Sequence, residues 1–353
     1  MNKTKIKIGI THGDINGIGY EVILKTLVDA GIYEMCIPIV YGSSKIAAYY
    51  RKNIGLENFS FNLIKYPIEA NPKRPNLINV LNDEFKAEPG AATPMSGKAA
   101  FLSLERATED LKKGLLDAIV TAPIHKQSIQ SNQFQFPGHT EYLQSKFGNG
   151  NQALMFLISD NLKIGTVTGH IPINEIAKNV KKEVILNKIR LIHQSLLKDF
   201  GLNRPRIAVL GLNPHASDNG LIGNEEQNEI IPAIKQAREE KILAFGPYPA
   251  DGFFASLTFK KFDAILAMYH DQGLTPFKLL AFEEGVNYTA GLSIVRTSPD
   301  HGTAFDIADK NMANPSSFRN ALYAAIDIWH KRKEFEEITQ NPVASIKKES
   351  TNE

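Results

Sequence analysis

Short apolar runs alternate along the chain with longer segments in which apolar residues recur every three or four positions. Nearly continuous apolar runs predict strands that are buried on both faces, as in a parallel sheet covered by helices. The predicted strands are residues 6–11, 36–41, 118–121, 164–168, 207–211, 264–268 and 292–296. The segments between them, such as 101–111 and 185–200, have the spacing of amphipathic helices. This alternation indicates an α/β fold with a mostly parallel sheet.

Two stretches interrupt the pattern. Residues 66–96 carry five prolines and little periodicity, which predicts a surface excursion or a short β extension. The stretch from about Lys331 is charged and ends in KKESTNE, so we expect it to fray.

Composition narrows the class of protein. A chain of 353 residues with 43% hydrophobic and 22% charged residues suits one large α/β domain or two domains. A net charge of +2 argues against nucleic acid or an anionic membrane as the main partner. Without a long apolar segment, and with Cys36 as its one cysteine, the chain is expected to be cytoplasmic, with no transmembrane helix and no internal disulfide.

Three histidines, His170, His215 and His270, each lie just beyond a predicted strand. In an open α/β sheet, ligands bind at the carboxyl ends of the strands, where these imidazoles can meet. Three imidazoles suit zinc, cobalt, nickel or iron(II), with an open position for substrate. A single histidine beside a strand is more often a hydrogen-bonded structural residue, and spacing alone leaves both interpretations open.

Two segments carry groups that suit an anion. His139 and Thr140 stand where a helix is predicted to begin, so free N–H groups, a hydroxyl and an imidazolium would converge on a phosphate. Lys278 and Arg296 together would neutralise a phosphate or a carboxylate, the arginine in bidentate fashion. The ordinary interpretations are an N-cap at Thr140 and solvated surface charges at the two cations.

Two glycine-containing segments follow predicted strands. Residues 11–19, THGDINGIG, match neither the dinucleotide fingerprint nor a P-loop, and predict a tight turn or a ligand-facing one. The loop HGTA at 301–304 consists of small residues that would let a flat ligand approach the backbone, or it is an ordinary loop before a helix.

Taken together, these segments resemble the 4-hydroxythreonine-4-phosphate dehydrogenase family of pyridoxal phosphate biosynthesis. The resemblance spans residues 8–325 and is carried in order by TxGDxxGIG, SGKAA, TAPI, FPGHTE, GHIP, GLNPHA, PAD, MYHDQG, GVNYTAGL and RTSPDHGTAFDIA. It implies the two-domain α/β/α fold, with mostly parallel sheets, of isocitrate and isopropylmalate dehydrogenases. We expect one domain of residues 1–128 plus 305–353, a second of 129–304, and the active site in the cleft between them.

The resemblance also implies roles for individual residues. The ligands of one divalent metal per site, zinc by preference and cobalt or magnesium otherwise, would be His170, His215 and His270. His270 would come from the second subunit of a homodimer. The substrate-binding residues would be His139, Thr140, Lys278, Asn287 and Arg296, and those at the NAD or NADP site His301, Gly302, Thr303 and Asn314. Asp251 and Asp271 are candidate proton acceptors, or partners that orient an imidazole.

The implied reaction is the NAD(P)- and metal-dependent oxidation of 4-phosphooxy-L-threonine. The product, 2-amino-3-oxo-4-(phosphooxy)butanoate, would lose CO2 to give 3-amino-2-oxopropyl phosphate. A sister dehydrogenase acting on 4-phospho-D-threonate or -erythronate is one alternative, since these substrates share the phosphate and carboxylate. A non-redox metal-dependent hydrolase is the alternative from another class.

The chain departs from the family at four places. His12 and Tyr20 stand where the family usually has proline, His125 where it has asparagine, and Gly252-Phe253 where it has Thr-Leu. Because Tyr20 and His125 flank predicted strand ends, they leave room for a different substrate preference.

Overall fold

The structure, a computed structural model, describes residues 5–148, 150 and 152–340. Its framework is one sheet of 12 strands in the order β3-β4-β2-β1-β5-β12-β11-β6-β7-β10-β8-β9. The pairings β12–β11, β11–β6 and β6–β7 are antiparallel, and the other pairings are parallel. The mostly parallel α/β fold predicted from the alternation is therefore confirmed.

The strands are β1 (Ile6–Thr11), β2 (Cys36–Gly42), β3 (Asn62–Ile64), β4 (Asn76–Asn79), β5 (Ala118–Thr121), β6 (Leu154–Ile158), β7 (Lys163–Thr166), β8 (Arg206–Leu210), β9 (Leu243–Tyr248), β10 (Ala264–Ala267), β11 (Val286–Ala290) and β12 (Val295–Pro299). The α-helices are α1 (Gly19–Leu27), α2 (Ile32–Met35), α3 (Ser44–Asn53), α4 (Pro94–Lys112), α5 (His139–Phe147), α6 (Ile173–Asn179), α7 (Lys182–Lys198), α8 (Ile231–Glu239), α9 (Ala250–Ala255), α10 (His270–Ala281) and α11 (Ser316–Gln340). Short 3-10 or π turns are η1 (Pro67–Glu69), η2 (Pro214–Gly220), η3 (Glu226–Ile230), η4 (Thr258–Lys261) and η5 (Phe305–Ile307).

All seven predicted strands are present. β1 and β5 have the predicted bounds, and the last lies at Val295–Pro299 rather than 292–296. The proline-rich stretch contributes η1 and β4, so its interpretation as a short β extension is confirmed. β3, β4, β6, β9 and β11 were not predicted as separate strands.

Helices cover both faces of the sheet. α1, α3, α7, α8 and α11 share one apolar cluster on one face. α4 and α5 cover the N-terminal half of the other face, and α9 and α10 cover its remaining half. Successive side chains of a strand point to opposite faces of the sheet, so one strand packs against helices on both faces. In β2, Val40 packs in the first cluster while Ile39 and Tyr41 pack in the second. Each large side chain fully buried in this way stabilises the fold by about 1.5 to 3 kcal/mol.

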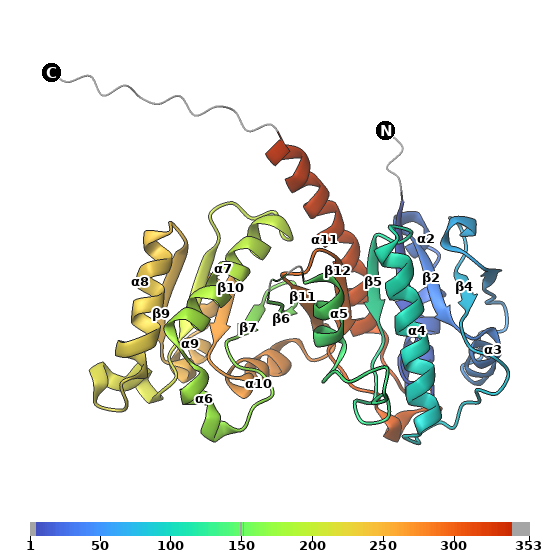
Figure 1. Cartoon of the computed structure of the whole chain (residues 1–353), viewed down its shortest axis with the longest axis horizontal. Helices are drawn as coiled ribbons and strands as arrows, with labels where there is room; N and C mark the ends of the chain where they lie inside the picture. The colour runs from blue at the N-terminus through green and yellow to red at the C-terminus, as the bar shows by residue number, and fades with distance from the viewer. Residues whose placement is uncertain (1–4, 149, 151, 341–353) are drawn as a thin grey trace.

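The sheet runs without a break through both predicted domains. β12 lies in the predicted second domain but pairs with β5 of the first, and α11 packs over β12. In Figure 1 the two halves lie on either side of α11, whose C-terminal end extends away from the body of the molecule. The domain boundaries at 128 and 305 stay a prediction.

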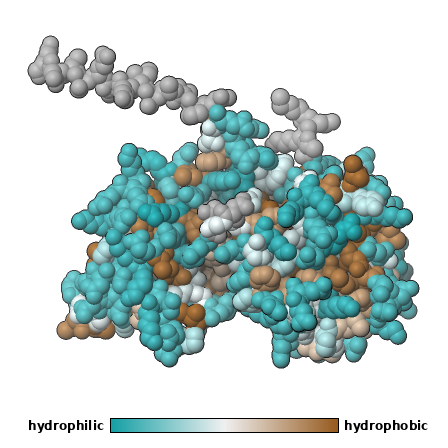
Figure 2. All heavy atoms as spheres, viewed as in Figure 1, coloured by the Kyte–Doolittle hydropathy of each residue, from teal (hydrophilic) through white to brown (hydrophobic). Residues whose placement is uncertain are grey.

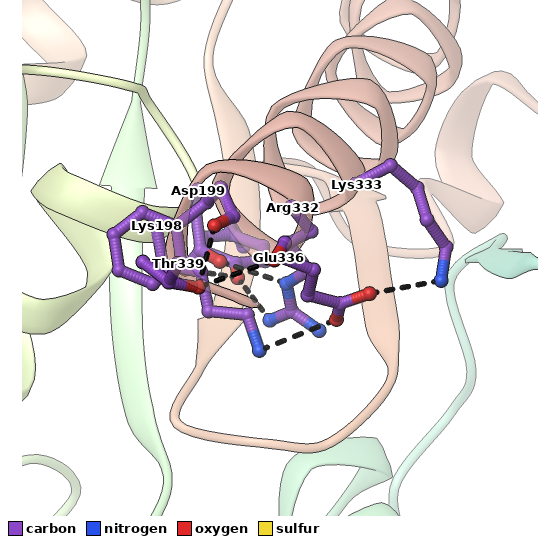
Figure 3. Close-up of polar contacts among 8 residues, drawn as sticks. Lys198, Asp199, Arg332, Lys333, Glu336 and Thr339 are labelled. Atoms are coloured by element: carbon purple, nitrogen blue, oxygen red, sulfur yellow. Dashed lines mark hydrogen bonds and ion pairs between the residues drawn. The ribbon is translucent and has the colours of Figure 1, made fainter. Parts of the chain in front are cut away.

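A buried polar cluster holds α11 against the second half of the sheet (Figure 3). Arg332 Nε donates to Asp199 Oδ1 at 2.7 Å, and Tyr288 OH and Ser195 Oγ both donate to Asp199 Oδ2 at 2.6 Å. Arg332 Nη2 donates to Tyr288 OH at 2.8 Å. Asp199 and Arg332 are 3% and 6% exposed, so this is an ion pair inside the protein. Contrary to the expectation of fraying from Lys331, α11 is helical to Gln340. The ion pair buries the helix at Arg332, while residues 337–340 are exposed and KKESTNE lies outside the described residues.

The surface carries no sign of a membrane span in the described part of the chain, where no helix is both long enough and apolar enough to cross a bilayer. The face in Figure 2 is mostly hydrophilic, and its hydrophobic residues are exposed in smaller patches between the polar ones.

Candidate active site

One cavity of about 780 Å³ collects most of the predicted site residues. All five predicted substrate-binding residues line it, together with two of the three strand-end histidines and part of the HGTA loop: His139, Thr140, Lys278, Asn287, Arg296, His170, His270, His301 and Gly302. They come from β11 and β12, the turns that follow β7 and β12, the N-terminus of α5, and the first and last turns of α10. His215, Asp251, Asp271, Thr303 and Asn314 do not line this cavity.

Arg296 is a buried cation without a carboxylate partner. Its side chain leaves β12 between the neighbouring strands β5 and β11 and is 3% exposed. Nε and Nη2 donate to Thr121 Oγ1 at 3.1 and 2.8 Å, and Nη1 donates to Thr289 Oγ1 at 3.0 Å. Burial lowers the pKa of Arg296 to about 10, so it still carries its charge at neutral pH. A buried charge is costly unless an opposite charge compensates it, which makes this wall of the cavity a site for an anion.

The N-terminus of α5 faces the same space. His139 is its first residue, and no side chain caps the helix. The free N–H groups and the positive end of the helix dipole favour an anion there. Burial, followed by the charges of Arg296 and Lys126, holds the pKa of His139 well below its usual value. The expected imidazolium is therefore disfavoured, and the buried Nε2 atom, which has no protein partner, belongs to a neutral ring.

Further polar groups extend the cation-rich wall. Lys278 Nζ lies 3.8 Å from Asp300 Oδ2, and burial raises the pKa of Asp300. Lys188 reaches the cavity from α7 and donates to the carbonyl of Ala153 at 3.2 Å. Asn287 on β11 has a buried Oδ1 atom with no partner in the protein, which leaves an acceptor for a ligand. The cavity therefore offers several cations, one free acceptor and few opposing carboxylates.

His170 and His270 lie beside each other at one end of the cavity. Their ring centroids are 5.2 Å apart, and His270 Nδ1 is 2.6 Å from Asp271 Oδ1. That contact leaves Nε2 of His270 free. Burial, followed by Lys126 and His270, lowers the pKa of His170 and favours the neutral ring that can bind a metal. The pair fits a divalent transition metal in donor type, and the lowered pKa of His170 suits that residue to the role.

The third histidine lies apart from this pair. His215 follows β8 in η2 and is exposed. Among the residues that the structure describes, one chain brings together no group of three or more His, Cys, Asp or Glu side chains suited to hold a metal. A complete three-histidine site within one subunit is thus not formed.

The two candidate proton acceptors lie outside the cavity. Asp271 is exposed and contacts His270, which is the geometry of a group that orients an imidazole. Asp251 stands in the first turn of α9 and is exposed.

The HGTA loop docks on the turn at residues 11–19. Ile18 N donates to the carbonyl of Thr303 at 3.0 Å, and a Cβ on Gly17 would come within 2.6 Å of that carbonyl oxygen. His301 Nε2 is buried without a partner, and the space beside Gly302 is open. A planar ligand has room beside Gly302, and His301 Nε2 is available to donate or accept a hydrogen bond. Asn314 instead accepts from Ser316 N at the start of α11.

Two of the family departures are internal rather than facing substrate. His12 and Tyr20 are fully buried, and their rings stack with centroids 5.2 Å apart, while Tyr20 stacks on Tyr50. Neither lines the cavity. His125 also lies outside it, where Nδ1 contacts Ser128 Oγ at 2.7 Å. In this structure none of the three departures touches the cavity directly.

The buried ring of His12 predicts an acid-sensitive contribution to stability. Burial lowers the pKa of His12 to about 4, below the ordinary value of about 6.5 in the unfolded chain. Between these values the unfolded state binds a proton and the folded state does not, so stability falls as the pH falls. The test is urea unfolding of the native protein and of His12→Gln at pH 7 and pH 4. From pH 7 to pH 4, the free energy of unfolding of the native protein should fall by up to about 3 kcal/mol more than that of His12→Gln. If the two proteins differ in free energy of unfolding by the same amount at both pH values, His12 does not make stability acid-sensitive.

Sequence reasoning missed several residues of the cavity wall, namely Thr121, Lys126, Glu141, Lys188 and Asp300. Asp300 directly precedes His301 and Glu141 directly follows Thr140, so their places in recognised motifs were available signals. Lys188 had none, because it is one of many polar positions on an amphipathic helix.

Known proteins resemble this chain along most of its length. Residues 34–325 match the family described as "Pyridoxal phosphate biosynthetic protein PdxA". The chain is 53% identical over 343 residues to a protein of Bacteroides thetaiotaomicron named 4-hydroxythreonine-4-phosphate dehydrogenase, covering 97% of this chain and 94% of that protein. It is 41% identical to a protein of Oceanobacillus iheyensis with the provisional name D-threonate 4-phosphate dehydrogenase, covering 93% and 99%.

A solved structure has the same architecture. The crystal structure of a 4-hydroxythreonine-4-phosphate dehydrogenase from Klebsiella pneumoniae superposes with a TM-score of 0.79 at 34% identity, covering 93% of this chain and 99% of that one.

Proposed function

Because this chain belongs to the PdxA family of pyridoxal phosphate biosynthetic proteins, we propose that it oxidises 4-phosphooxy-L-threonine with NAD or NADP. The hydroxyl carbon would lose a hydride to the nicotinamide and a proton to an acceptor, giving 2-amino-3-oxo-4-(phosphooxy)butanoate. Cleavage of the bond to the carboxylate then releases CO2, and protonation of the remaining carbon gives 3-amino-2-oxopropyl phosphate.

The observation that carries the proposal is the buried, uncompensated charge of Arg296 in a cation-rich cavity. A substrate with a phosphate and a carboxylate supplies the missing negative charge. Arg296, Lys278 and the N-terminus of α5 at His139 and Thr140 would bind these two groups, and Asn287 would accept a hydrogen bond from the substrate. The arginine forks onto two oxygens at once, which orients as well as binds.

The donor sets fit the metal and the cofactor that the family implies. His170 and His215 of one subunit and His270 of a second would hold a divalent metal, zinc by preference, with Asp271 orienting His270. His301 and Gly302, with Thr303 and Asn314 nearby, would hold the nicotinamide cofactor. When bound, the metal supplies Lewis acidity to the oxygen being oxidised and the cofactor accepts the hydride. Asp251 stays a candidate proton acceptor, and Asp300, with a cavity-lining carboxyl whose pKa burial raises, is a second.

A homodimer with a shared active site is the arrangement we propose for the metal. Support comes from the incomplete donor set of one chain, whose described residues bring together no three side chains suited to hold a metal. In the arrangement implied by the family, His270 of one subunit would complete a site with His170 and His215 of the other. The cytoplasmic location stays a prediction.

A second candidate is favoured by one relative, the protein of Oceanobacillus iheyensis named for D-threonate 4-phosphate. That substrate carries a hydroxyl where phosphooxythreonine has an amine. The two carboxylates on the cavity wall, Glu141 and Asp300, favour the substrate with the positive amine.

The test is absorbance at the NADH band with each substrate in turn, using NAD and NADP separately. We expect turnover with 4-phosphooxy-L-threonine to exceed that with 4-phospho-D-threonate, and to stop when the metal is removed by a chelator and resume when zinc or cobalt is returned. The reverse preference would establish the second candidate. Substrate consumption without an absorbance change would replace both with a hydrolase.

A further inference from the structure

The three strand-end histidines belong to adjacent strands in the order β7-β10-β8. Both pairings are parallel, so the carboxyl ends of the strands meet at one edge of the sheet. Each histidine lies in the turn that follows its strand. Such turns are irregular backbone, and the sheet alone does not fix the positions of their side chains relative to one another.

Side chains link these turns across the strands. Gln272, two residues after His270, accepts from Met268 N at 2.7 Å through Oε1 and donates to the carbonyl of Gly211 at 2.6 Å through Nε2. It therefore ties the turn after β10 to the turn after β8. On the other side, Thr168 donates from both N and Oγ1 to the carbonyl of Met268, at 3.1 and 2.8 Å. One chain of hydrogen bonds thus runs through all three turns.

A buried carboxylate anchors the end of this chain next to His215. Glu226 is fully buried, and Oε1 accepts from the backbone N–H groups of Leu212 and Asn213 at 2.7 and 2.8 Å. Oε2 accepts from Asn213 Nδ2 at 2.9 Å. Within the described residues no lysine or arginine forms an ion pair with it, so two backbone N–H groups and the Asn213 amide compensate its charge.

The backbone that follows is strained. His215 to Asn219 all have positive φ, between 45° and 69°, although none is glycine. This left-handed backbone is unfavourable for residues other than glycine, because the Cβ lies too close to the following carbonyl oxygen. The turn folds back so closely that a Cβ on Gly211 would lie 2.9 Å from the Cα of Ala216. Such strain persists where the surroundings over-determine it, and it gathers at functional sites.

We propose that Gln272 and Glu226 are positioning residues: Gln272 fixes the turn that carries His270, and Glu226 fixes the turn that carries His215, so that each imidazole is preorganised for the divalent-metal site that two subunits would share. The proposal rests on the metal role of the histidines proposed above. Neither residue reaches the cavity, so neither is a ligand or a substrate contact. Each acts on metal affinity through the imidazole that it places, as hydrogen-bond partners of metal ligands do.

The test uses isosteric exchanges in the full-length protein. Gln272→Glu puts a second oxygen against the carbonyl of Gly211, and Glu226→Gln replaces one of the two acceptor oxygens with an amide. Titration with Co²⁺ alone, followed by its visible absorption, and competition for Zn²⁺ with a chromophoric chelator measure affinity. We expect each exchange to raise the metal Kd about 10- to 100-fold, with kcat restored at high metal concentration. Gln194→Glu, an exposed glutamine on α7, is the matched control and should leave the Kd unchanged.

The outcomes separate the two proposals. If the native protein binds no Co²⁺ or Zn²⁺, the metal role fails and this inference with it. If the native protein binds metal and His215→Ala loses it, but both exchanges only lower the melting temperature, Gln272 and Glu226 are structural braces and the inference is overturned. If Gln272→Glu does not fold, Gln272→Met takes its place in the metal titration, because it removes both side-chain hydrogen bonds of Gln272 without adding a charge.

Discussion

Replacing Arg296 with methionine is expected to lower kcat/KM for the phosphorylated substrate on the order of 1,000-fold, about 4 kcal/mol. The guanidinium is held by Thr121 and Thr289 and has no carboxylate of its own, so the substrate anion is its natural partner. Two charge-assisted hydrogen bonds to an anion account for a loss of this size.

The same change should leave the free energy of unfolding unchanged or slightly higher. Removing a buried charge relieves a desolvation cost, and methionine fills much of the space. Steady-state kinetics and urea unfolding on the same preparations check both halves of this prediction. Arg296→Lys keeps the charge but cannot donate two parallel hydrogen bonds to one anion. Its kcat/KM should therefore lie between those of the native protein and Arg296→Met. Arg206→Met on β8, whose guanidinium stacks on Phe245 outside the cavity, is the control for activity. A stable Arg296→Met protein with native kinetics would contradict the anion site.

Replacing Asp199 with alanine is expected to lower the free energy of unfolding by about 3 to 5 kcal/mol. The change would leave Arg332 buried with its Nε donor unpaired and would remove the acceptor for Tyr288 and Ser195. The end of α11 would then lose its polar attachment to α7 and β11 (Figure 3). Urea unfolding monitored by circular dichroism measures the loss.

A double-mutant cycle shows whether the ion pair is responsible. Asp199→Ala combined with Arg332→Met should recover part of the loss, because the second change removes the unpaired charge. The surface pair Arg190–Glu240 is the matched control, and its removal should lower the free energy of unfolding far less, because water and salt screen it. Equal losses at the two pairs would refute the buried role of Asp199.

Much of the sheet is predictable because parallel strands covered on both faces need continuous apolar runs. β5 (AIVT) is largely apolar and β1 (IKIGIT) has isoleucine at every second position, and the bounds of both match the prediction. β11, with the sequence VNYTA, carries a polar residue that faces the cavity. Its strand character comes from antiparallel pairing with β6 and β12, which are distant in sequence. β6 is apolar, but a short apolar run does not by itself distinguish a strand from a helix.

The candidate site divides in the same way. His139, Thr140, Lys278, Asn287 and Arg296 lie in motifs that the family resemblance identifies, and the structure gathers all five in one cavity. Lys188 joins them only because α7 packs beside β11, and Thr121, which lies in the TAPI motif, meets Arg296 because β5 pairs with β12. Arg332 lies in a stretch whose charge predicts solvent exposure, yet it is buried.

The amino-acid sequence by itself determined the α/β class, the strand ends that carry the three histidines, and the chemical types of the anion-binding groups. These features depend on local patterns of burial and on residue chemistry, which a linear chain displays directly. Only the tertiary structure decided that Arg296 has no carboxylate partner, that His139 is neutral, that His170 meets His270 without His215, and that Gln272 links two turns. Each of these depends on distances between strands far apart in the chain, and on the water that packing removes from between them.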